Sequence, residues 1–439
     1  MTKTAQMKLG LFATNVGHHI AAWRHPSATV NNGTVFHHQL RLAQTAERGM
    51  FDAFFLADGA GVPNLPPAIM ARGSRCVSFE PSTLLAALSQ VTHRIGLVAT
   101  SSSTYDQPFH VAHKFMSLDH LSHGRAGWNL VTGVNSTEAL NFNSTAMMAH
   151  AERYARACEF AQAVLGLWYS WEAQHDPQRF AHVGKHFSVR GGVPLPPSPQ
   201  GRPVLVQAGG SEAGKELAAE TAEMIYSVQQ DLGEAQGFYR DVKGRMAKYG
   251  RSPDDLKIMP GVFPIVGRSQ QEAEDKFGEL QDLVDADLAV AALALAMGRP
   301  ELALFPLDGP VPDDLESNAG TTHLKILTEI ARARKLTLRQ LSIEVAGGYG
   351  HWTVRGTPQH IADQLEERFA AKAADGFNVM PATLPGGLDD FVDQVVPELQ
   401  RRGLVRTEYR GATLRDHLGL SPPRVRGDSR ADVRVLAQA

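Results

Sequence analysis

The feature that most constrains the fold is an eightfold alternation of short apolar runs with amphipathic stretches. The apolar runs predict buried strands over Leu9–Ala13, Phe51–Ala57, Ile95–Thr100, Ala126–Thr132, Pro203–Ala208, Met224–Ser227, Lys257–Val266 and Phe377–Met380. The stretches that follow them predict helices over His37–Arg48, Ser82–Val91, Val111–Leu121, Ala151–Trp168, Ala213–Thr221, Gln236–Tyr249, Gln270–Val284 and Leu388–Arg401. Parallel strands that are buried on both faces have this continuous apolar character. Eight strand–helix pairs predict an α/β fold, the (β/α)8 TIM barrel, with a doubly wound open sheet as the alternative.

Two insertions interrupt the alternation, after the fourth and the seventh predicted strands. The first, near residues 169–202, is rich in Pro and Gly, and the second, near residues 286–352, is mostly helical. Its helix candidates are Ala289–Met297 and Thr322–Ala333. Long insertions in a compact fold are typical of lids and interface elements, so 286–352 is a candidate lid with Gly347–His351 at its closing edge. We expect residues 1–420 to form a single barrel domain and residues 421–439 an extended tail.

Charge and cysteine content exclude several classes of protein. The 43 Lys and Arg and 46 Asp and Glu give a net charge of −3, which excludes a broadly basic nucleic-acid-binding protein. The two cysteines, Cys76 and Cys158, exclude a disulfide scaffold and a cysteine-rich metal site, and they fit a reducing compartment. No apolar stretch approaches the roughly 20 residues of a membrane span. We therefore expect a cytoplasmic protein with no membrane or nucleic-acid partner and no bound metal.

Polar residues follow six of the predicted strands. In a closed parallel barrel these strand ends meet at one mouth, where the chemistry takes place. The residues in question are Thr14, Asn15, Gly17, His18 and His19; Asp58 and Gly59; Ser101, Ser102, Ser103 and Thr104; Trp128, Asn129 and Thr132; Gly209, Gly210 and Ser211; and Ser227. The four consecutive hydroxyls at 101–104 suit ribityl or phosphate oxygens, or hydrogen bonds within their own loop.

The segment Gly209–Lys215 nearly matches a nucleotide P-loop. Glu216 replaces the Ser or Thr that would bind magnesium, so a nucleoside triphosphate site is not indicated. Two glycines followed by a helix N-terminus still suit a phosphate group. The alternative is that Ser211 only caps the helix. The residues alone predict a barrel that binds a phosphorylated small ligand.

Several motifs resemble a known family. They include Gly17-His18-His19, Ala22–Pro26, Phe51–Asp58, Thr100–Thr104, Pro108–Ala112, Asp119–Thr132, His150–Tyr154 and Gln207–Ser211. On these residues the chain resembles the bacterial-luciferase-like flavin monooxygenases, in the branch of the nitrilotriacetate and dibenzothiophene-sulfone monooxygenases. The resemblance covers roughly residues 7–420.

The resemblance implies a two-component monooxygenase that uses FMN in its reduced form, FMNH2. A separate NAD(P)H:flavin reductase would supply the FMNH2, through a transient complex or by diffusion. The reduced flavin would react with O2 to give a C4a-hydroperoxide, which oxidises a small organic substrate. A homodimer or homotetramer is expected. The open alternatives are a deazaflavin-dependent oxidoreductase on a related barrel and a flavin-binding protein without catalysis.

The resemblance also implies site residues. The cofactor-binding set is Asp58, Thr104, His150, Tyr154, Ser211 and Ser227, with Ser103, Asn129 and Gly210 as further candidates. His150 and Tyr154 are four residues apart and so share one helix face. The substrate side would hold His18, His19, Trp23 and Arg24. Arg24 would bind an anionic substrate or, alternatively, form a salt bridge. No catalytic residue is assigned.

Overall fold

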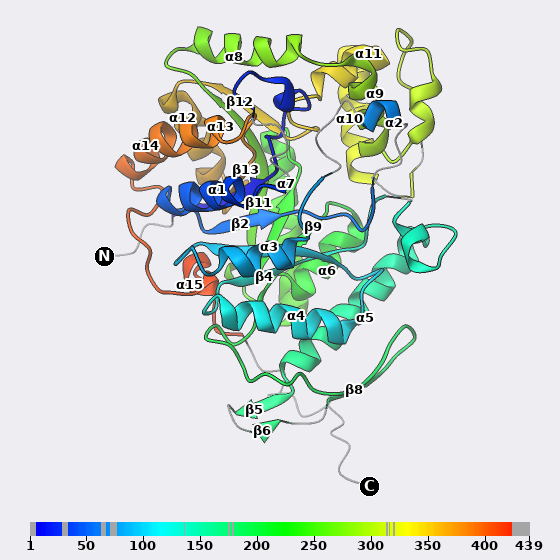
Figure 1. Ribbon diagram of the computed structural model, residues 1–439, viewed down its shortest axis with the longest axis vertical. Helices are drawn as coiled ribbons and strands as arrows, with labels where there is room; N and C mark the ends of the chain where they lie inside the picture. Colours follow the sequence, from blue (N-terminus) through cyan, green and yellow to red (C-terminus); the bar gives the residue numbers. More distant parts are fainter. Residues whose placement is uncertain are drawn as a thin grey trace.

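The computed structural model describes residues 6–28, 34–62, 67–70, 77–135, 137–173, 176–177, 180–312, 315, 317–318 and 321–423 (Figure 1). Its centre is a closed barrel of parallel strands. In order around the barrel these are β1 (Lys8–Ala13), β2 (Ala53–Leu56), β3 (Gly96–Ser102), β4 (Ala126–Val131), β9 (Val204–Ala208), β10 (Met224–Ser227), β11 (Lys257–Val266) and β13 (Gly376–Val379). The sheet closes because β13 pairs with β1, for example Val379 with Leu11. The predicted (β/α)8 barrel is therefore confirmed, and the open sheet is wrong.

One further parallel strand extends the sheet outside the barrel. β12 (Trp352–Gly356) pairs with Val262–Val266, the second half of β11. The first half of β11 pairs with β10 inside the barrel. With ten residues, β11 is long enough to pair with β10 along its first half and with β12 along its second half. The sequence analysis did not predict β12.

The eight predicted helices are all present and surround the barrel. Seven of them are α1 (Phe36–Arg48), α3 (Pro81–Leu88), α4 (Pro108–Leu121), α5 (His150–Trp168), α6 (Glu212–Thr221), α7 (Leu232–Arg245) and α8 (Gln270–Asp282). A further helix, α12 (Pro358–Ala370), precedes β13 and was not predicted. α7 begins earlier than predicted because Asp231 accepts hydrogen bonds from the first-turn amides. The last predicted helix is divided into α13 (Gly386–Asp390), a π-helical turn and α14 (Val396–Arg401). Pro397, which has no N–H to donate, is the second residue of α14, just after the π-helical turn.

Apolar side chains fill the barrel interior. A C-terminal helix closes the end of the barrel at which the strands begin. The interior cluster includes Phe55, Val206 and Tyr226. Leu414 and Leu418 of α15 (Leu414–Leu418) belong to the same cluster. Lys8, the first residue of β1, donates its Nζ to the His417 carbonyl at 2.7 Å, so α15 lies at the N-terminal ends of the strands. The opposite end is left for a ligand.

The insertion after β4 forms two antiparallel hairpins, at the bottom of Figure 1. They consist of β5 (Trp171–Ala173) with β6 (Asp176–Pro177) and β7 (Phe180–Val183) with β8 (Ser188–Gly191). Glu159 of α5 accepts hydrogen bonds from the amides of His186 and Phe187, which ties the second hairpin to the barrel.

The second insertion contains α9 (Ala286–Ala296), α10 (Thr321–Arg334) and α11 (Leu338–Glu344), at the upper right of Figure 1. These helices share an apolar cluster of their own that includes Leu293, Leu327 and Leu341. The tail expected at 421–439 lies outside the described residues from 424 onward. None of the described helices is long and apolar enough to cross a membrane.

Candidate active site

A pocket of about 390 Å³ opens at the C-terminal ends of the barrel strands. Every barrel strand contributes at least one residue to its lining. One from each strand in turn is Phe12, Phe55, Thr100, Asn129, Gln207, Tyr226, Gly261 and Asn378. The pocket is thus built on the rigid barrel, and the loops and the second insertion complete its walls.

Seven of the nine predicted cofactor-binding residues line this pocket. They are Asp58, Asn129, His150, Tyr154, Gly210, Ser211 and Ser227. Ser103 and Thr104 do not line it. Their hydroxyls donate to the carbonyls of Val131 and Thr132, at 3.1 and 2.9 Å. These two hydroxyls therefore join the loop after β3 to the end of β4, and a contact between them and a cofactor stays a prediction.

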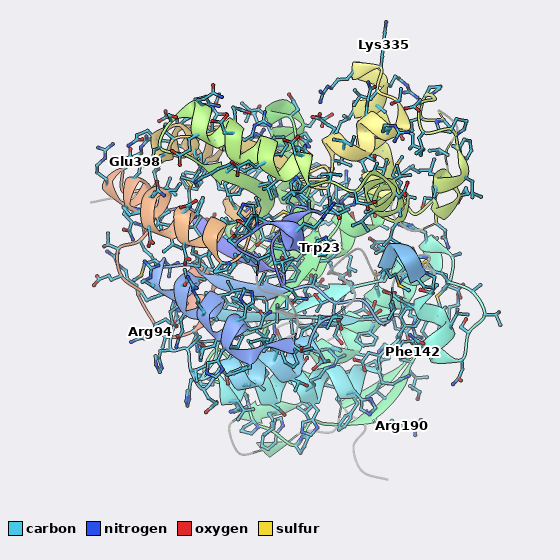
Figure 2. The ribbon with its side chains drawn as sticks, turned by 45° about the horizontal axis from the view of Figure 1, so that its top comes forward. Trp23, Arg94, Phe142, Arg190, Lys335 and Glu398 are labelled. Carbon is cyan, nitrogen blue, oxygen red and sulfur yellow. The ribbon has the colours of Figure 1, made fainter. Side chains whose placement is uncertain are left out.

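The four predicted substrate-side residues lie outside the pocket lining. His18 and His19 are buried, with His18 Nε2 2.9 Å from the Phe12 carbonyl oxygen. Trp23 is half-buried near the centre of the view in Figure 2. Arg24 is exposed, and its Nη1 donates to the Leu283 carbonyl at 2.7 Å. A substrate-binding role for these residues stays a prediction.

Helices α5 and α6 bring a tyrosine hydroxyl to a helix N-terminus. The rings of His150 and Tyr154 lie with their centroids 4.7 Å apart, as their spacing on one helix face predicts. A Cβ atom at Gly209 or at Gly214 would lie 3.5 or 3.2 Å from the Tyr154 hydroxyl oxygen. The φ of +149° at Gly209 also favours glycine there. The amides at the start of α6 and this hydroxyl together suit an anion such as phosphate.

Two side chains of the P-loop-like segment have other partners. Ser211 Oγ accepts a hydrogen bond from the Gly214 amide at 3.1 Å, so it caps α6. Lys215 forms ion pairs with Glu212 and Asp241 and does not line the pocket. The anion-binding capacity of this segment therefore lies in its backbone amides.

Eight buried polar atoms in the pocket lining have no hydrogen-bond partner among the described residues. They are Asn129 Oδ1, Glu138 Oε2, Arg153 Nε, Gln207 Oε1, Tyr226 OH, Ser227 Oγ, His351 Nδ1 and Asn378 Oδ1. A buried polar atom without a partner costs about 1–3 kcal/mol. Donors and acceptors both occur in the set, so it suits a ligand that carries both. Within the parts of the chain that the structure describes, no three His, Cys, Asp or Glu side chains are grouped to hold a metal ion.

Burial shifts the titration of the acidic and basic groups in the pocket. It raises the pKa of Asp58 to about 6 and that of Glu138 to about 7. It lowers the pKa of His351 to about 3, and the neighbouring His323 and His18 add to this effect. Burial and Arg153 lower the pKa of His150. Near neutral pH the pocket therefore contains neutral histidines, the Arg153 cation and carboxyl groups that can exchange a proton.

The sequence analysis missed several lining residues, among them Glu138, Arg153 and His323. Arg153 lies three residues after His150, so helix periodicity gave a signal for it. Glu138 lies seven residues beyond the end of β4, and His323 belongs to the second insertion. His351, expected at the closing edge of a lid, does line the pocket.

Known proteins share the whole of this architecture. The sequence model for Luciferase-like monooxygenase matches residues 11–375. The chain is 45% identical to N-acetyl-S-(2-succino)cysteine monooxygenase of Bacillus subtilis (strain 168), over 96% of this chain and 98% of the relative. It is 44% identical to nitrilotriacetate monooxygenase component A of Aminobacter aminovorans, over 97% and 98%.

A solved structure agrees with these sequence matches. The structure of a riboflavin lyase with modified FMN and substrate riboflavin superposes with a TM-score of 0.86 at 30% identity. That superposition covers 95% of this chain and 96% of the lyase. The family predicted from the motifs is thereby confirmed, and the chain belongs to the luciferase-like monooxygenases.

Proposed function

We propose that this protein is the oxygenase component of a two-component system that uses FMNH2 and O2 to oxidise a small organic molecule. A separate NAD(P)H:flavin reductase would supply the FMNH2. The observation that most supports this proposal is the set of unpartnered buried polar atoms around the pocket at the C-terminal ends of the barrel strands. The name of the Aminobacter relative, component A, supports a partner protein.

The residues present fit FMN. The start of α6 and the Tyr154 hydroxyl would hold the phosphate. The unpartnered amide oxygens of Asn129, Gln207 and Asn378 would accept hydrogen bonds from donors of the flavin. When bound, reduced FMN would supply the electrons that activate dioxygen.

The chain's own residues would bind, orient and exclude water. Phe12 and Phe55 provide apolar lining from the barrel, while His323 and His351 line the pocket from the second insertion and its edge. Exclusion of water by these residues and the bound ligands would strengthen the polar contacts in the pocket and protect reactive species.

The reaction can be tested with the purified protein, FMN, a separate NADH:flavin reductase and NADH. N-acetyl-S-(2-succino)cysteine and nitrilotriacetate are the first substrates to try, because relatives that are 45% and 44% identical are named for them. We expect dioxygen uptake and a product of changed mass, and both should require the reductase. Rapid NADH oxidation without the reductase would contradict a two-component system. Flavin binding without oxidation of any candidate would favour a binding protein, and turnover without dioxygen uptake would favour the deazaflavin alternative.

We also expect a preference for FMN over riboflavin. Each charge-assisted hydrogen bond to the phosphate should contribute about 1.5–3 kcal/mol. Equilibrium dialysis of the reduced flavins under anaerobic conditions measures this difference. Equal affinities for the two reduced flavins would remove the phosphate site from the proposal.

A further inference from the structure

Glu138 places a buried carboxyl group in the pocket with only one of its oxygens anchored. It begins the 3-10 helix η3 (Glu138–Phe142), is 3% exposed and lines the pocket. Its Oε1 accepts a hydrogen bond from the Ala60 amide at 3.3 Å. Its Oε2 is buried and has no hydrogen-bond partner among the described residues. One oxygen is therefore held by the protein and the other is available to a ligand.

The loops around this carboxyl group leave space for it. A Cβ atom at Gly133 would lie 2.6 Å from Glu138 Oε2, and one at Gly59 would lie 3.4 Å from Oε1. Gly133 has a φ of +78°, which a residue with a side chain rarely adopts. A second hydrogen bond, from Asn141 Nδ2 to the Ala60 carbonyl at 2.9 Å, ties η3 to the loop that carries Asp58.

Ionisable groups face Glu138 from three other elements. Asp58 comes from the loop after β2, Tyr105 from the loop after β3 and Arg153 from α5. Burial and the Asp58 carboxylate raise the pKa of Glu138 to about 7, while Arg153 and the Ala60 amide oppose the rise. Burial and Glu138 raise the pKa of Tyr105, which therefore stays protonated. Both protonation states of Glu138 are populated near neutral pH, as proton transfer requires.

We propose that Glu138 is a catalytic residue that exchanges a proton with the small molecule oxidised in the pocket. In the forward direction the O–H bond at Oε2 breaks while an O–H or N–H bond forms on the bound molecule. The electron pair of the broken bond stays on Oε2. The Ala60 amide and the Arg153 cation stabilise the resulting carboxylate. Water returns the proton, so the step needs no additional oxidant or reductant.

This inference rests on the proposed function, and single-turnover kinetics test it. Anaerobically photoreduced FMN and the protein are mixed with oxygenated buffer that contains N-acetyl-S-(2-succino)cysteine or, separately, nitrilotriacetate. Glu138→Gln keeps the size of the side chain and an acceptor for the Ala60 amide but cannot titrate. General acid–base catalysis contributes about 10²–10⁴-fold, so the variant should lose at least about 100-fold in the rate of product formation. Its pH profile should lack the midpoint near 7, and oxidised FMN should bind with unchanged affinity.

Two control variants separate proton transfer from anchoring. Asn141→Ala breaks the other hydrogen bond between η3 and the Asp58 loop, and Glu152→Gln removes an exposed carboxylate on α5. Both variants should keep the pH profile of the unmodified protein. The inference fails if Glu138→Gln keeps that profile, or if Asn141→Ala loses it in the same way.

Infrared difference spectra give a readout without flavin or substrate. The spectrum of the unmodified protein minus that of Glu138→Gln should show a protonated carboxyl band at pH 6 that disappears with a midpoint near pH 7. Asp58→Asn should lower this midpoint, because it removes a neighbouring negative charge. Absence of the band overturns the inference even in an active enzyme. An unmodified protein that binds no FMN and oxidises nothing instead counts against the proposed function.

Discussion

Glu223 is the carboxylate that joins the C-terminal helix α15 to the N-terminal end of the barrel strands. It lies just before β10, buried between Arg202, just before β9, and Arg415 of α15. Arg202 donates to its two oxygens at 2.8 and 3.1 Å, and Arg415 at 2.6 and 3.2 Å. The Leu205 amide adds a fifth hydrogen bond at 3.0 Å. We predict that Glu223→Gln destabilises the fold without altering the pocket at the opposite end.

The expected loss follows from the pKa of Glu223. Burial alone would raise it, but the two guanidinium groups outweigh burial and lower the pKa from 4.5 to about 2. Since a tenfold change in proton affinity corresponds to about 1.4 kcal/mol, the carboxylate contributes about 3 kcal/mol to stability at neutral pH. Removing one partner of a buried ion pair costs a similar amount, about 3–5 kcal/mol.

The pH dependence has a definite sign. A carboxylate with a lowered pKa stabilises the fold above its unfolded pKa, and this contribution is lost as the pH falls toward the folded pKa. The difference in unfolding free energy between the unmodified protein and Glu223→Gln should stay constant from about pH 8 to 5. It should then shrink as the pH falls from 4.5 toward 2. Urea unfolding followed by fluorescence and circular dichroism measures it.

Asp308 provides an exposed control. Arg339 donates to both of its oxygens, at 2.8 and 3.3 Å, and this ion pair lowers the pKa of Asp308. The side chain of Asp308 is 79% exposed, whereas that of Glu223 is 8% exposed. Water and side-chain freedom replace much of such a surface interaction. Asp308→Asn should therefore destabilise the fold much less than Glu223→Gln. Equal losses in the two variants would refute the argument from burial.

Three further changes test other parts of the structure. Tyr154→Phe should weaken FMNH2 binding by about 0.5–2 kcal/mol and change the saturated rate less, measured as rate against reduced-flavin concentration; an unchanged affinity with a collapsed rate would contradict this. Leu414→Ala should cost about 2–5 kcal/mol in the free energy of unfolding, because Leu414 is fully buried in the barrel interior. Gly133→Ala should lower the free energy of unfolding by about 1–3 kcal/mol, because Gly133 has a left-handed φ. An unfolding curve that matches that of the unmodified protein would contradict this.

Local sequence signals predicted the barrel because its strands are buried on both faces. An apolar run such as Phe54-Phe55-Leu56 identifies such a strand without knowledge of its neighbours. β12 was missed because Trp352–Gly356 mixes polar and apolar residues and pairs only with the end of β11 outside the barrel. The hairpins near 171–191 were missed because a Pro- and Gly-rich segment gives no periodicity to follow.

The candidate site was predicted only where residues directly follow a strand or match the family pattern. Gln207 and Asn378 lie within apolar strands, and their side chains line the pocket. A polar residue inside a buried strand needs a partner, which is a usable signal for a ligand. That reasoning would have found these two, whereas Asn129 was predicted from the set of strand-end residues and from the family resemblance. No local pattern brings Glu138 to Asp58, since the Ala60 amide that joins them is 78 residues away in sequence.

The second insertion supplies an interaction that the sequence of α5 lacks. Ala149 at the N-cap of α5 makes no side-chain hydrogen bond to the helix. Instead, Asn318 Oδ1 accepts a hydrogen bond from the His150 amide at 2.8 Å, and the Asn318 carbonyl accepts one from Arg153 Nη2 at 2.6 Å. A cap of this kind contributes about 1 kcal/mol to helix stability. Movement of the insertion away from the pocket would break both hydrogen bonds, so the position of the insertion and the placement of Arg153 beside Glu138 are coupled.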